Sequence, residues 1–363
     1  LSFINPDFVK DISFYAGGWQ PKYGDKLSSS LNIEYKEPDG FEGSASVGLL
    51  GGKIYLGGSS DNQRSKFSIG IRHKDARYLL NTLEVSGQYF PKYTDLQGFF
   101  TFDLTQKSSH LINKTKLNWL LSYGRNRYQT IPISQNTVFG SVTQNFKLQT
   151  DFMGIESLDY DTYQTGLNLT HRANNRFKIS LIASTVSTQE NENFEVEGAY
   201  RLCDIDQKIQ VNFDDRCIVT RAIGTDYDYG RNLLNVRIST IENRNEWLIN
   251  SNNLLEFGFG MSHQNIADDI QEYRFIDSAD YVTSTQYIQN KFIMSSNNYF
   301  GYLQYSFFDH DSSHVFNMGS RFNYMDWTNQ FLLSPRVQYQ YRPNWSVPTR
   351  INFSIGYYHQ HPQ

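Results

Sequence analysis

The sequence has no long apolar run and no excess of basic charge. No stretch approaches the roughly 18 consecutive apolar residues that a membrane-spanning helix needs, so any crossing of a bilayer has to use strands. The 33 basic and 37 acidic residues give a net charge of −4, and no Lys/Arg run forms the positive stripe that a phosphate backbone requires. The sequence therefore predicts neither a helical membrane span nor a nucleic-acid partner.

Recognisable catalytic and metal-binding patterns are also absent. The chain contains no GxSxG element and no Ser/His/Asp constellation of the kind that activates a nucleophile. Its two cysteines lack CxxC spacing and a His at zinc-finger spacing, and the acidic residues between 268 and 280 lack EF-hand spacing. The sequence therefore predicts no enzyme activity, no metal site and no cofactor.

The composition that remains is polar and aromatic at once. Aromatic residues make up 15% of the chain, yet the mean hydropathy is −0.55. A membrane barrel needs apolar residues on only one face of each strand and aromatic rings at its two interfaces, which fits this mixture. A soluble β-sandwich or a carbohydrate-binding module with aromatic platforms shares much of the same composition. Composition alone leaves both open.

A period of two recurs along most of the chain, which is the primary signal for strands with two different faces. Leu117, Trp119, Leu121 and Tyr123, for example, alternate with mostly polar neighbours. The same alternation occurs at 67–72, 100–105, 167–170, 177–183, 257–261, 316–324, 337–341 and 351–357. The pattern predicts about thirteen strands. Because an odd number does not close a bacterial barrel, we expect further strands beyond Gln363.

The predicted connections alternate between short and long. Short polar turns are expected at Asp61–Ser65, Lys107–Lys114, Asn174–Arg176, Asn243–Asn245, Asp309–Ser313 and Pro343–Pro348. Much longer segments are expected as loops at Ala76–Asp95, Gln189–Arg231 and Ala267–Asn298, far above the usual loop length. Tight turns on one side and long loops on the other are typical of outer-membrane barrels. This alternation favours the barrel over the sandwich.

The stretch FYAGGWQPKYGDKLSSSLNIEYKEP, Phe14–Pro38, precedes the first predicted barrel strand. Its motif residues are Gly17, Gly18, Tyr23, Gly24, Asp25 and Ser28, followed by Ser29 and Ser30. The stretch resembles the end of the plug domain in TonB-dependent outer-membrane receptors, especially those of the Bacteroidota. Further collinear matches to these receptors lie at Tyr227–Ile238, Phe257–Tyr281, Asn298–Phe307, Leu332–Trp345 and Ile351–Pro362.

The resemblance implies an all-β fold, a transmembrane antiparallel β-barrel with a plug domain, of which this chain supplies a part. Residues 1–40 would be the C-terminal end of the plug, and residues 41–363 the N-terminal part, about half, of a barrel of roughly 22 strands. The implied function is uptake of a scarce ligand across the outer membrane. The implied partners are outer-membrane lipid, the TonB–ExbB–ExbD system, a surface lipoprotein and a ligand whose identity stays open.

Two other functions remain open alongside uptake. A structural or assembly subunit of an outer-membrane complex could reuse a receptor barrel, and a passive porin-like channel could use the same strands. A plug argues against the channel, and the TonB-contacting segment of the full-length protein would separate a receptor from a structural subunit.

Cys203 and Cys217 are the only cysteines. In an oxidising compartment a disulfide between them would close a loop of about 15 residues and add about 3 kcal/mol on the chain-entropy model. Two free thiols are the alternative. Because the strand at 177–183 leaves a short turn, we expect both cysteines to lie on the long-loop side, outside the membrane.

Aromatic girdles are expected where the barrel wall meets the lipid headgroups, because amphipathic rings favour that level. The candidates for these girdles are Trp119, Tyr123, Tyr324, Trp327, Tyr339 and Tyr341.

Overall fold

The computed structural model describes residues 4–80, 88–105, 114–140, 144–205, 217–278, 281–311 and 313–360. Nearly all regular structure in these ranges is β-strand, with a short 3-10 helix η1 (Pro6–Phe8) and one turn of α-helix, α1 (Arg77–Leu80). None of the described helices is long and apolar enough to cross a membrane. Two strands form a small sheet of their own, β1 (Val9–Tyr15) and β2 (Ser30–Tyr35).

All other described strands belong to one antiparallel sheet, called the wall below. They are β3 (Glu42–Gly48), β4 (Gly51–Ser59), β5 (Ser65–Asp75), β6 (Gln88–Tyr89), β7 (Lys92–Asp103), β8 (Lys114–Ile131), β9 (Gln135–Gly140), β10 (Asn145–Arg172), β11 (Phe177–Ile205), β12 (Cys217–Asn250), β13 (Asn253–Ser278), β14 (Tyr281–Phe308), β15 (His314–Met325), β16 (Gln330–Tyr341) and β17 (Ile351–Gly356).

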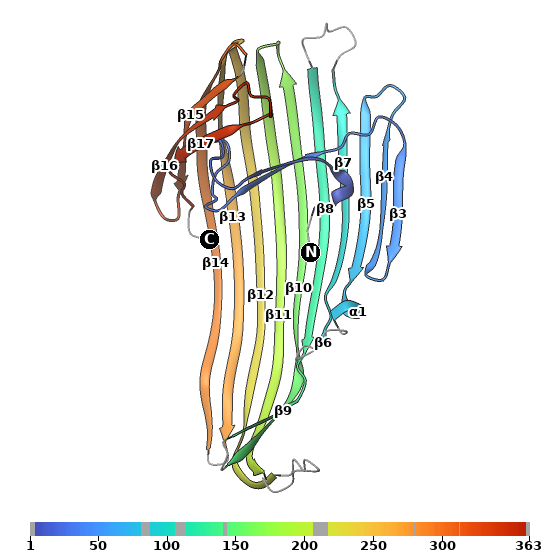
Figure 1. The fold of residues 1–363 in the computed structure, drawn as a ribbon, viewed down its shortest axis with the longest axis vertical. Coiled ribbons are helices and arrows are strands. Elements are labelled where there is room, and N and C mark those ends of the chain that lie inside the picture. The colour runs from blue at the N-terminus through green and yellow to red at the C-terminus, as the bar shows by residue number, and fades with distance from the viewer. Residues whose placement is uncertain are drawn as a thin grey trace.

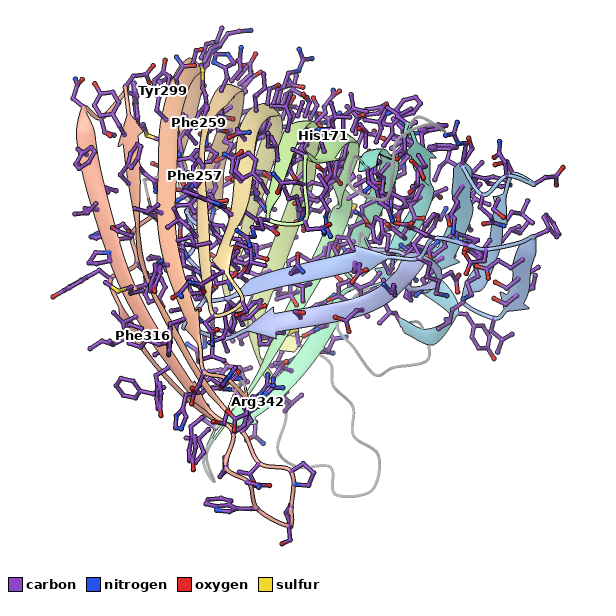
Figure 2. All side chains as sticks on the ribbon, turned by 90° about the horizontal axis from the view of Figure 1, so that it is seen from above. His171, Phe257, Phe259, Tyr299, Phe316 and Arg342 are labelled. Atoms are coloured by element: carbon purple, nitrogen blue, oxygen red, sulfur yellow. A yellow bond between two sulfur atoms is a disulfide. The ribbon has the colours of Figure 1, made fainter. Side chains whose placement is uncertain are left out.

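The strands of the wall follow one another in chain order, each paired with its sequence neighbour, from β3 at one edge to β17 at the other. Thirteen of the described strands form this path, and the short strands β6 and β9 pair beside it with β8 and β10. Seen along the strands, the wall is a trough that does not close (Figure 2). The fold is thus the up-and-down antiparallel arrangement of an incomplete barrel, as the alternation of the sequence predicted.

The two faces of the wall differ in chemistry. The outer face carries the apolar residues of each strand: Trp119 pairs with Phe100 on one side and with Leu167 on the other, and Leu117 pairs with Leu169. These side chains are exposed, at 43% for Leu167 and 37% for Trp119. Phe316 likewise points away from the trough in Figure 2.

The inner face of the wall, which lines the trough, carries polar residues, many of them buried. In the described residues more polar than apolar side chains are buried, and large apolar side chains dominate among the exposed ones. A soluble domain has the opposite distribution. The structure therefore rules out the soluble sandwich that composition alone left open, because the described strands form one wall whose apolar side chains lie on its outer face.

Aromatic rings on the outer face lie at two levels. On the side of the long hairpins, Tyr123 packs against Tyr163 with ring centroids 4.8 Å apart, and Tyr324 lies beside Tyr299 at 6.4 Å. Trp327 lies just beyond, in the turn between β15 and β16, and is 55% exposed.

The second level lies on the side of the short turns, where Tyr339 and Tyr341 flank His314. Eight residues of β15 separate Tyr324 from Phe316, the register partner of Tyr339. They span about 27 Å of strand, which a tilt of about 40° reduces to roughly 21 Å. That height is close to the roughly 25 Å apolar band of outer-membrane barrels. Trp119 lies between the two levels.

The part of the outer face between these two levels of rings is called the belt below. Five central strands continue far beyond this belt. The strands β10 to β14 are 26 to 34 residues long, whereas about 9–11 residues suffice to span a bilayer. They project from one end of the wall as a group of long hairpins (Figure 1). The expected loops at Gln189–Arg231 and Ala267–Asn298 were therefore wrong for the described residues, which are mostly strand. Polar side chains on both faces hide the period of two, while the strands stay paired apart from register shifts at 202–205 and 274–275.

The turn predicted at Asn243–Asn245 was also wrong, because β12 runs on to Asn250 and the chain turns at Ser251–Asn252. Asn243 and Asn245 stay in the ladder and bond sideways with their amides to the backbone oxygens of Ser180 and Phe257. The turns at Asp61–Ser65 and Asn174–Arg176 are confirmed, as are those at 309–313 and 343–348 for their described residues. Most of Lys107–Lys114 and the middle of Ala76–Asp95 lie outside the described residues.

Candidate functional site

The N-terminal segment, residues 4–40, lies across the inner face of the wall. In Figures 1 and 2 the β1–β2 ribbon crosses the trough from the short strands β4–β7 to the strands β14–β17. The segment therefore contacts the wall at two separate places. The first lies where η1 meets β4 and β5, and the second lies where the connection between β1 and β2, residues 16–29, meets β14–β17.

Phe8 anchors the first place. Its ring is 1% exposed and meets Tyr55 edge-on, with centroids 5.5 Å apart. Gly70 on β5 makes room for it, because a Cβ there would lie 2.9 Å from the Phe8 ring and 2.8 Å from the Asn5 amide nitrogen. A larger residue at this position of the wall would force the side chains of Phe8 and Asn5 to shift.

Ion pairs add to the docking along the whole segment. Each joins a charged side chain of the segment to one on the inner face of the wall: Asp7 with Lys53 at 2.7 Å, Lys22 with Glu256 at 3.4 Å, and Glu37 with Lys116. Pairs of this exposure contribute about 0–1 kcal/mol each, so they set the register of the segment more than its stability.

Arg336 on β16 holds the second place. Its side chain is buried, and Nη1 donates hydrogen bonds to three backbone oxygens of the segment, Trp19 at 3.3 Å, Gln20 at 2.9 Å and Tyr23 at 2.7 Å. The guanidinium also lies 4.7 Å from the ring centroid of Tyr358 and 5.8 Å from that of Trp19. Arg336 thus binds the segment through its backbone, whatever side chains the segment carries at those three positions.

The carboxylate of Asp25 forms a separate contact with the wall. Asn323 donates to its Oδ1 at 3.0 Å, and Asn298 donates to its Oδ2 at 3.3 Å. The Nη2 atom of Arg321 lies 3.7 Å from Oδ2. Asp25 has a φ of +56°, a conformation that Asp tolerates better than most residues, and this turns its side chain toward β14 and β15.

A cavity of about 370 Å³ lies between residues 22–26 of the segment and the inner face of β12–β15. Arg244, Glu242 and Arg321 supply charged groups from the wall, while Lys22, Asp25 and Lys26 supply them from the segment. Phe300, Met325 and Ile238 contribute apolar surface. Both the segment and the wall line this cavity, and charged side chains from both contribute to it.

Four of the six plug-end motif residues meet the wall. Gly18 lies against Ser354, and its carbonyl accepts from Gln338. Gly24 lies against Arg321. The carbonyl of Tyr23 accepts from Arg336, and the carboxylate of Asp25 accepts from the Asn323 amide. Burial raises the pKa of Tyr23 above its ordinary value, so the phenol stays neutral. The other two motif residues do not meet it: Gly17 has a φ of +107° and nothing within 4 Å of where a Cβ would lie, and Ser28 is exposed.

Sequence reasoning missed the wall residues of this site. Arg321, Asn323 and Arg336 lie on the polar face of β15 and β16, which the alternation identified only as lumen-facing. A signal was present at Arg336, which stands between Pro335 and Val337 in a short strand, because an arginine is costly to bury without a partner. The sequence could not say that the partner lies about 300 residues away.

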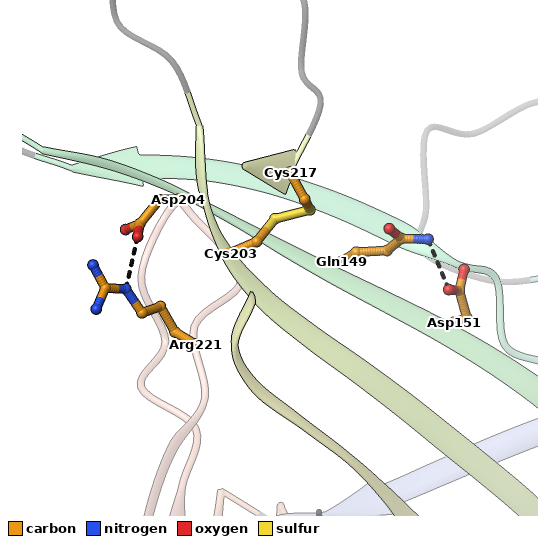
Figure 3. The surroundings of a disulfide bond; sticks show 6 residues. All are labelled: Gln149, Asp151, Cys203, Asp204, Cys217 and Arg221. Carbon is orange, nitrogen blue, oxygen red and sulfur yellow. Dashed lines mark hydrogen bonds and ion pairs between the residues drawn. A yellow bond between two sulfur atoms is a disulfide. The ribbon is translucent and has the colours of Figure 1, made fainter. Parts of the chain in front are cut away.

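The two cysteines lie far from this site. Cys203 and Cys217 are joined by a disulfide near the tip of the β11–β12 hairpin, with their Cα atoms 5.4 Å apart (Figure 3). Beside it, Arg221 donates to Asp204 at 2.7 Å across the same two strands. The disulfide thus ties the end of a hairpin that projects beyond the apolar belt, and residues 206–216 between the cysteines lie outside the described residues.

No candidate metal centre accompanies these features. Among the described residues, no group of three or more His, Cys, Asp or Glu side chains is placed to hold a metal ion. The arrangement around residues 18–25 is one of hydrogen bonds and ion pairs between a crossing segment and a sheet, and it can hold, release or admit polar groups.

No protein-family model and no curated protein matches the sequence. Solved structures with partial similarity include the ferric-catecholate import receptor Fiu from E. coli K12, with a TM-score of 0.30 and 8% identity over 96% of this chain and 70% of that one. The FpvAI–pyocin S2 complex gives 0.27 and 10%, over 96% and 67% of the two chains. The ferripyoverdine receptor of the outer membrane of Pseudomonas aeruginosa gives 0.25 and 9%, over 96% and 69%. Scores this low carry no argument about function, and the fold rests on the strand pairing itself.

Proposed function

We propose that this chain is part of a TonB-dependent outer-membrane receptor of the Bacteroidota type that imports a scarce ligand. Residues 1–40 are the end of its plug, and residues 41–363 form part of its barrel wall. One observation carries the proposal: a wall that is apolar outside holds a separate N-terminal segment across its polar inner face. No catalytic step is part of this function.

The outer face supports a location in the outer membrane. Its exposed Leu, Ile and Phe side chains form a belt between two levels of aromatic rings, at the spacing that a bilayer requires. In water such a surface would be an aggregation hazard. In lipid the same side chains are at their favoured depth, and the antiparallel ladder satisfies the backbone without water.

The contacts of the segment support its role as a removable plug end. Apart from Phe8 and Trp19, the segment is held mainly by hydrogen bonds and ion pairs such as those of Arg336 and Asp25. Water can replace polar contacts of this kind when the segment moves away, so the net cost of release is modest for each contact. A force transmitted by the TonB–ExbB–ExbD system would therefore displace the segment without disrupting the wall.

The long hairpins β10–β14 would capture the ligand and contact a surface lipoprotein partner, because they project beyond the belt on the side away from the short turns. Tyr229 and Tyr273 stack there with centroids 4.5 Å apart, and Arg231 lies 4.4 Å from the Tyr229 ring. Partly exposed aromatic side chains of this kind are common in binding surfaces. The chemical identity of the ligand is not specified by them.

Energy-dependent thiol labelling in whole cells tests the proposal. Asn323 is 1% exposed beneath Asp25, so a cysteine in the Asn323→Cys variant reacts with a membrane-impermeant maleimide only when the segment moves. The native cysteines form a disulfide and stay silent. Gln271→Cys, on an exposed part of β13, is the matched control that reacts in every state.

A receptor driven by TonB predicts that an uncoupler of the proton gradient lowers labelling of Asn323→Cys and leaves Gln271→Cys unchanged. Equal labelling of Asn323→Cys with and without the uncoupler contradicts energised transport. Slow labelling in both conditions would favour a structural subunit, and fast labelling in both would favour a passive channel.

A further inference from the structure

The cavity beneath residues 22–26 contains buried polar atoms that have no hydrogen-bond partner among the described residues. They are Nη1 of Arg321, Nε of Arg244, Oε1 of Glu242 and Oδ1 of Asn298. Arg321, Glu242 and Asn298 are all more than nine-tenths buried, and all four residues line the cavity. Leaving such atoms unpaired costs about 1–3 kcal/mol each, so the cavity has unused binding capacity for a polar group.

The unpaired atoms are held in fixed positions by their other contacts. Arg321 lies 4.4 Å from the ring centroid of Phe300 and donates from Nε to Asn323 at 3.0 Å, which directs Nη1 away from both. Arg244 donates from Nη2 to Glu242 at 2.8 Å. Two guanidinium donors and two oxygen acceptors in the lining of the cavity therefore remain unpaired, and groups held in place by other contacts bind at low entropic cost.

The chemistry of these atoms selects the ligand class. The lining carries four cationic side chains, Lys22, Lys26, Arg244 and Arg321, against two anionic ones, Asp25 and Glu242. One free N–H from each of two arginines suits the two oxygens of a carboxylate, which accept charge-assisted hydrogen bonds. The free oxygen of the Glu242 carboxylate needs a donor on the same molecule, which a hydroxyl group supplies.

We propose that this cavity binds a small hydroxycarboxylate, with its carboxylate accepting from Arg321 and Arg244 and its hydroxyl donating to Glu242. The site opposes docking of the segment, because Arg321 also lies 3.7 Å from the carboxylate of Asp25. Two carboxylates then share one guanidinium and repel each other. By linkage, a bound hydroxycarboxylate loosens residues 22–26, and a docked Asp25 weakens the hydroxycarboxylate by the same factor.

Calorimetry on the purified full-length protein in detergent tests the site with L-malate as the probe. Succinate, which lacks only the hydroxyl, and inorganic phosphate are the comparison ligands, all at matched ionic strength. Arg321→Gln should lower malate affinity at least tenfold. Asp25→Asn keeps the shape of the side chain but removes the repelling charge, and should raise malate affinity by roughly tenfold. Asp7→Asn removes a carboxylate at the other docking place and should change nothing.

Malate binding that exceeds succinate and phosphate binding, is lost in Arg321→Gln and is strengthened in Asp25→Asn supports the proposal. Equal binding of malate and succinate overturns the hydroxyl contact, tighter binding of phosphate overturns the ligand class, and unchanged or weaker binding in Asp25→Asn overturns the antagonism. Asp25→Asn keeps the test decisive if Arg321→Gln fails to fold. These measurements use no energised membrane, so their failure leaves the proposed import function standing.

Discussion

Replacing Arg336 with methionine removes the contact that holds the backbone of residues 19–23. Methionine keeps an unbranched side chain of similar length between Trp19 and Tyr358 but donates no hydrogen bond. Hydrogen bonds to a charged donor contribute about 1.5–3 kcal/mol, and the contacts with the two rings add about 0.5–2 kcal/mol. Against this, the wall no longer has to bury a guanidinium, which costs several kcal/mol. Because the three carbonyls lose their donor at once, we expect a net weakening of about 2–3 kcal/mol.

Amide hydrogen exchange of residues 18–25 measures this change directly, since the segment has to leave the wall before its amides exchange. A weakening of 2–3 kcal/mol corresponds to roughly 30- to 150-fold faster exchange in Arg336→Met. Arg125→Gln breaks a partly exposed pair with Asp161 on the outer face and should leave residues 18–25 unchanged. Exchange as slow in Arg336→Met as in the wild type would refute the reasoning and mean that desolvation of the arginine cancels its hydrogen bonds.

Three further predictions concern other parts of the molecule. Gly70→Ala should loosen the docking of residues 5–8 by about 1–3 kcal/mol, measured by hydrogen exchange, because the added Cβ overlaps Phe8. Gly40→Ala is the control, since nothing lies within 4 Å of an added Cβ there, and it should leave the docking unchanged. Equal effects of the two variants would contradict the Phe8 contact. Cys203→Ser should remove about 3 kcal/mol of local stability from the tip of the β11–β12 hairpin. The loss should be seen as faster hydrogen exchange near residues 199–205 and 217–223. Faster exchange that spreads to the belt would show instead that the disulfide supports the wall. The pKa of Asp226 lies below its ordinary value because Arg274 donates to its carboxylate. This pair therefore stabilises the hairpin above about pH 4, and its contribution of at most about 1 kcal/mol is lost as the pH falls through the lowered pKa. Exchange protection near residue 226 that does not fall between pH 7 and pH 3, or that Asp226→Asn leaves intact at pH 7, would contradict this stabilisation.

Much of the wall could be predicted from the sequence because a strand with one apolar and one polar face follows a simple pattern. Wherever the wall has such faces, as at Leu117–Tyr123, apolar residues recur at every second position. Beyond the belt both faces meet water, and strands such as 189–205 lose that pattern although their backbones stay paired. Asn243 and Asn245 show the same limit, because a residue type common in turns is also able to bond sideways within a sheet.

Only the residues that the N-terminal segment contributes to the candidate site could be predicted from the sequence. The Gly, Tyr and Asp residues of 17–25 form a recognisable motif because a crossing segment needs tight turns at fixed positions. Their partners on the wall do not form one, since Arg321, Asn323 and Arg336 differ from other lumen-facing polar residues only in what approaches them. That approach depends on how the trough curves, which is a property of the whole sheet.

Tryptophan quenching by brominated lipid tests the central claim that the outer face meets lipid while the N-terminal segment docks on the opposite face. The protein has five tryptophans, and single-tryptophan variants reconstituted in bilayers separate Trp119, which is on the outer belt and 37% exposed, from Trp19, which is 1% exposed on the inner face. Phospholipids brominated in their acyl chains should quench Trp119 strongly and Trp19 hardly at all. Quenching of Trp19 that equals that of Trp119, or no quenching of Trp119, would contradict the assignment of the two faces.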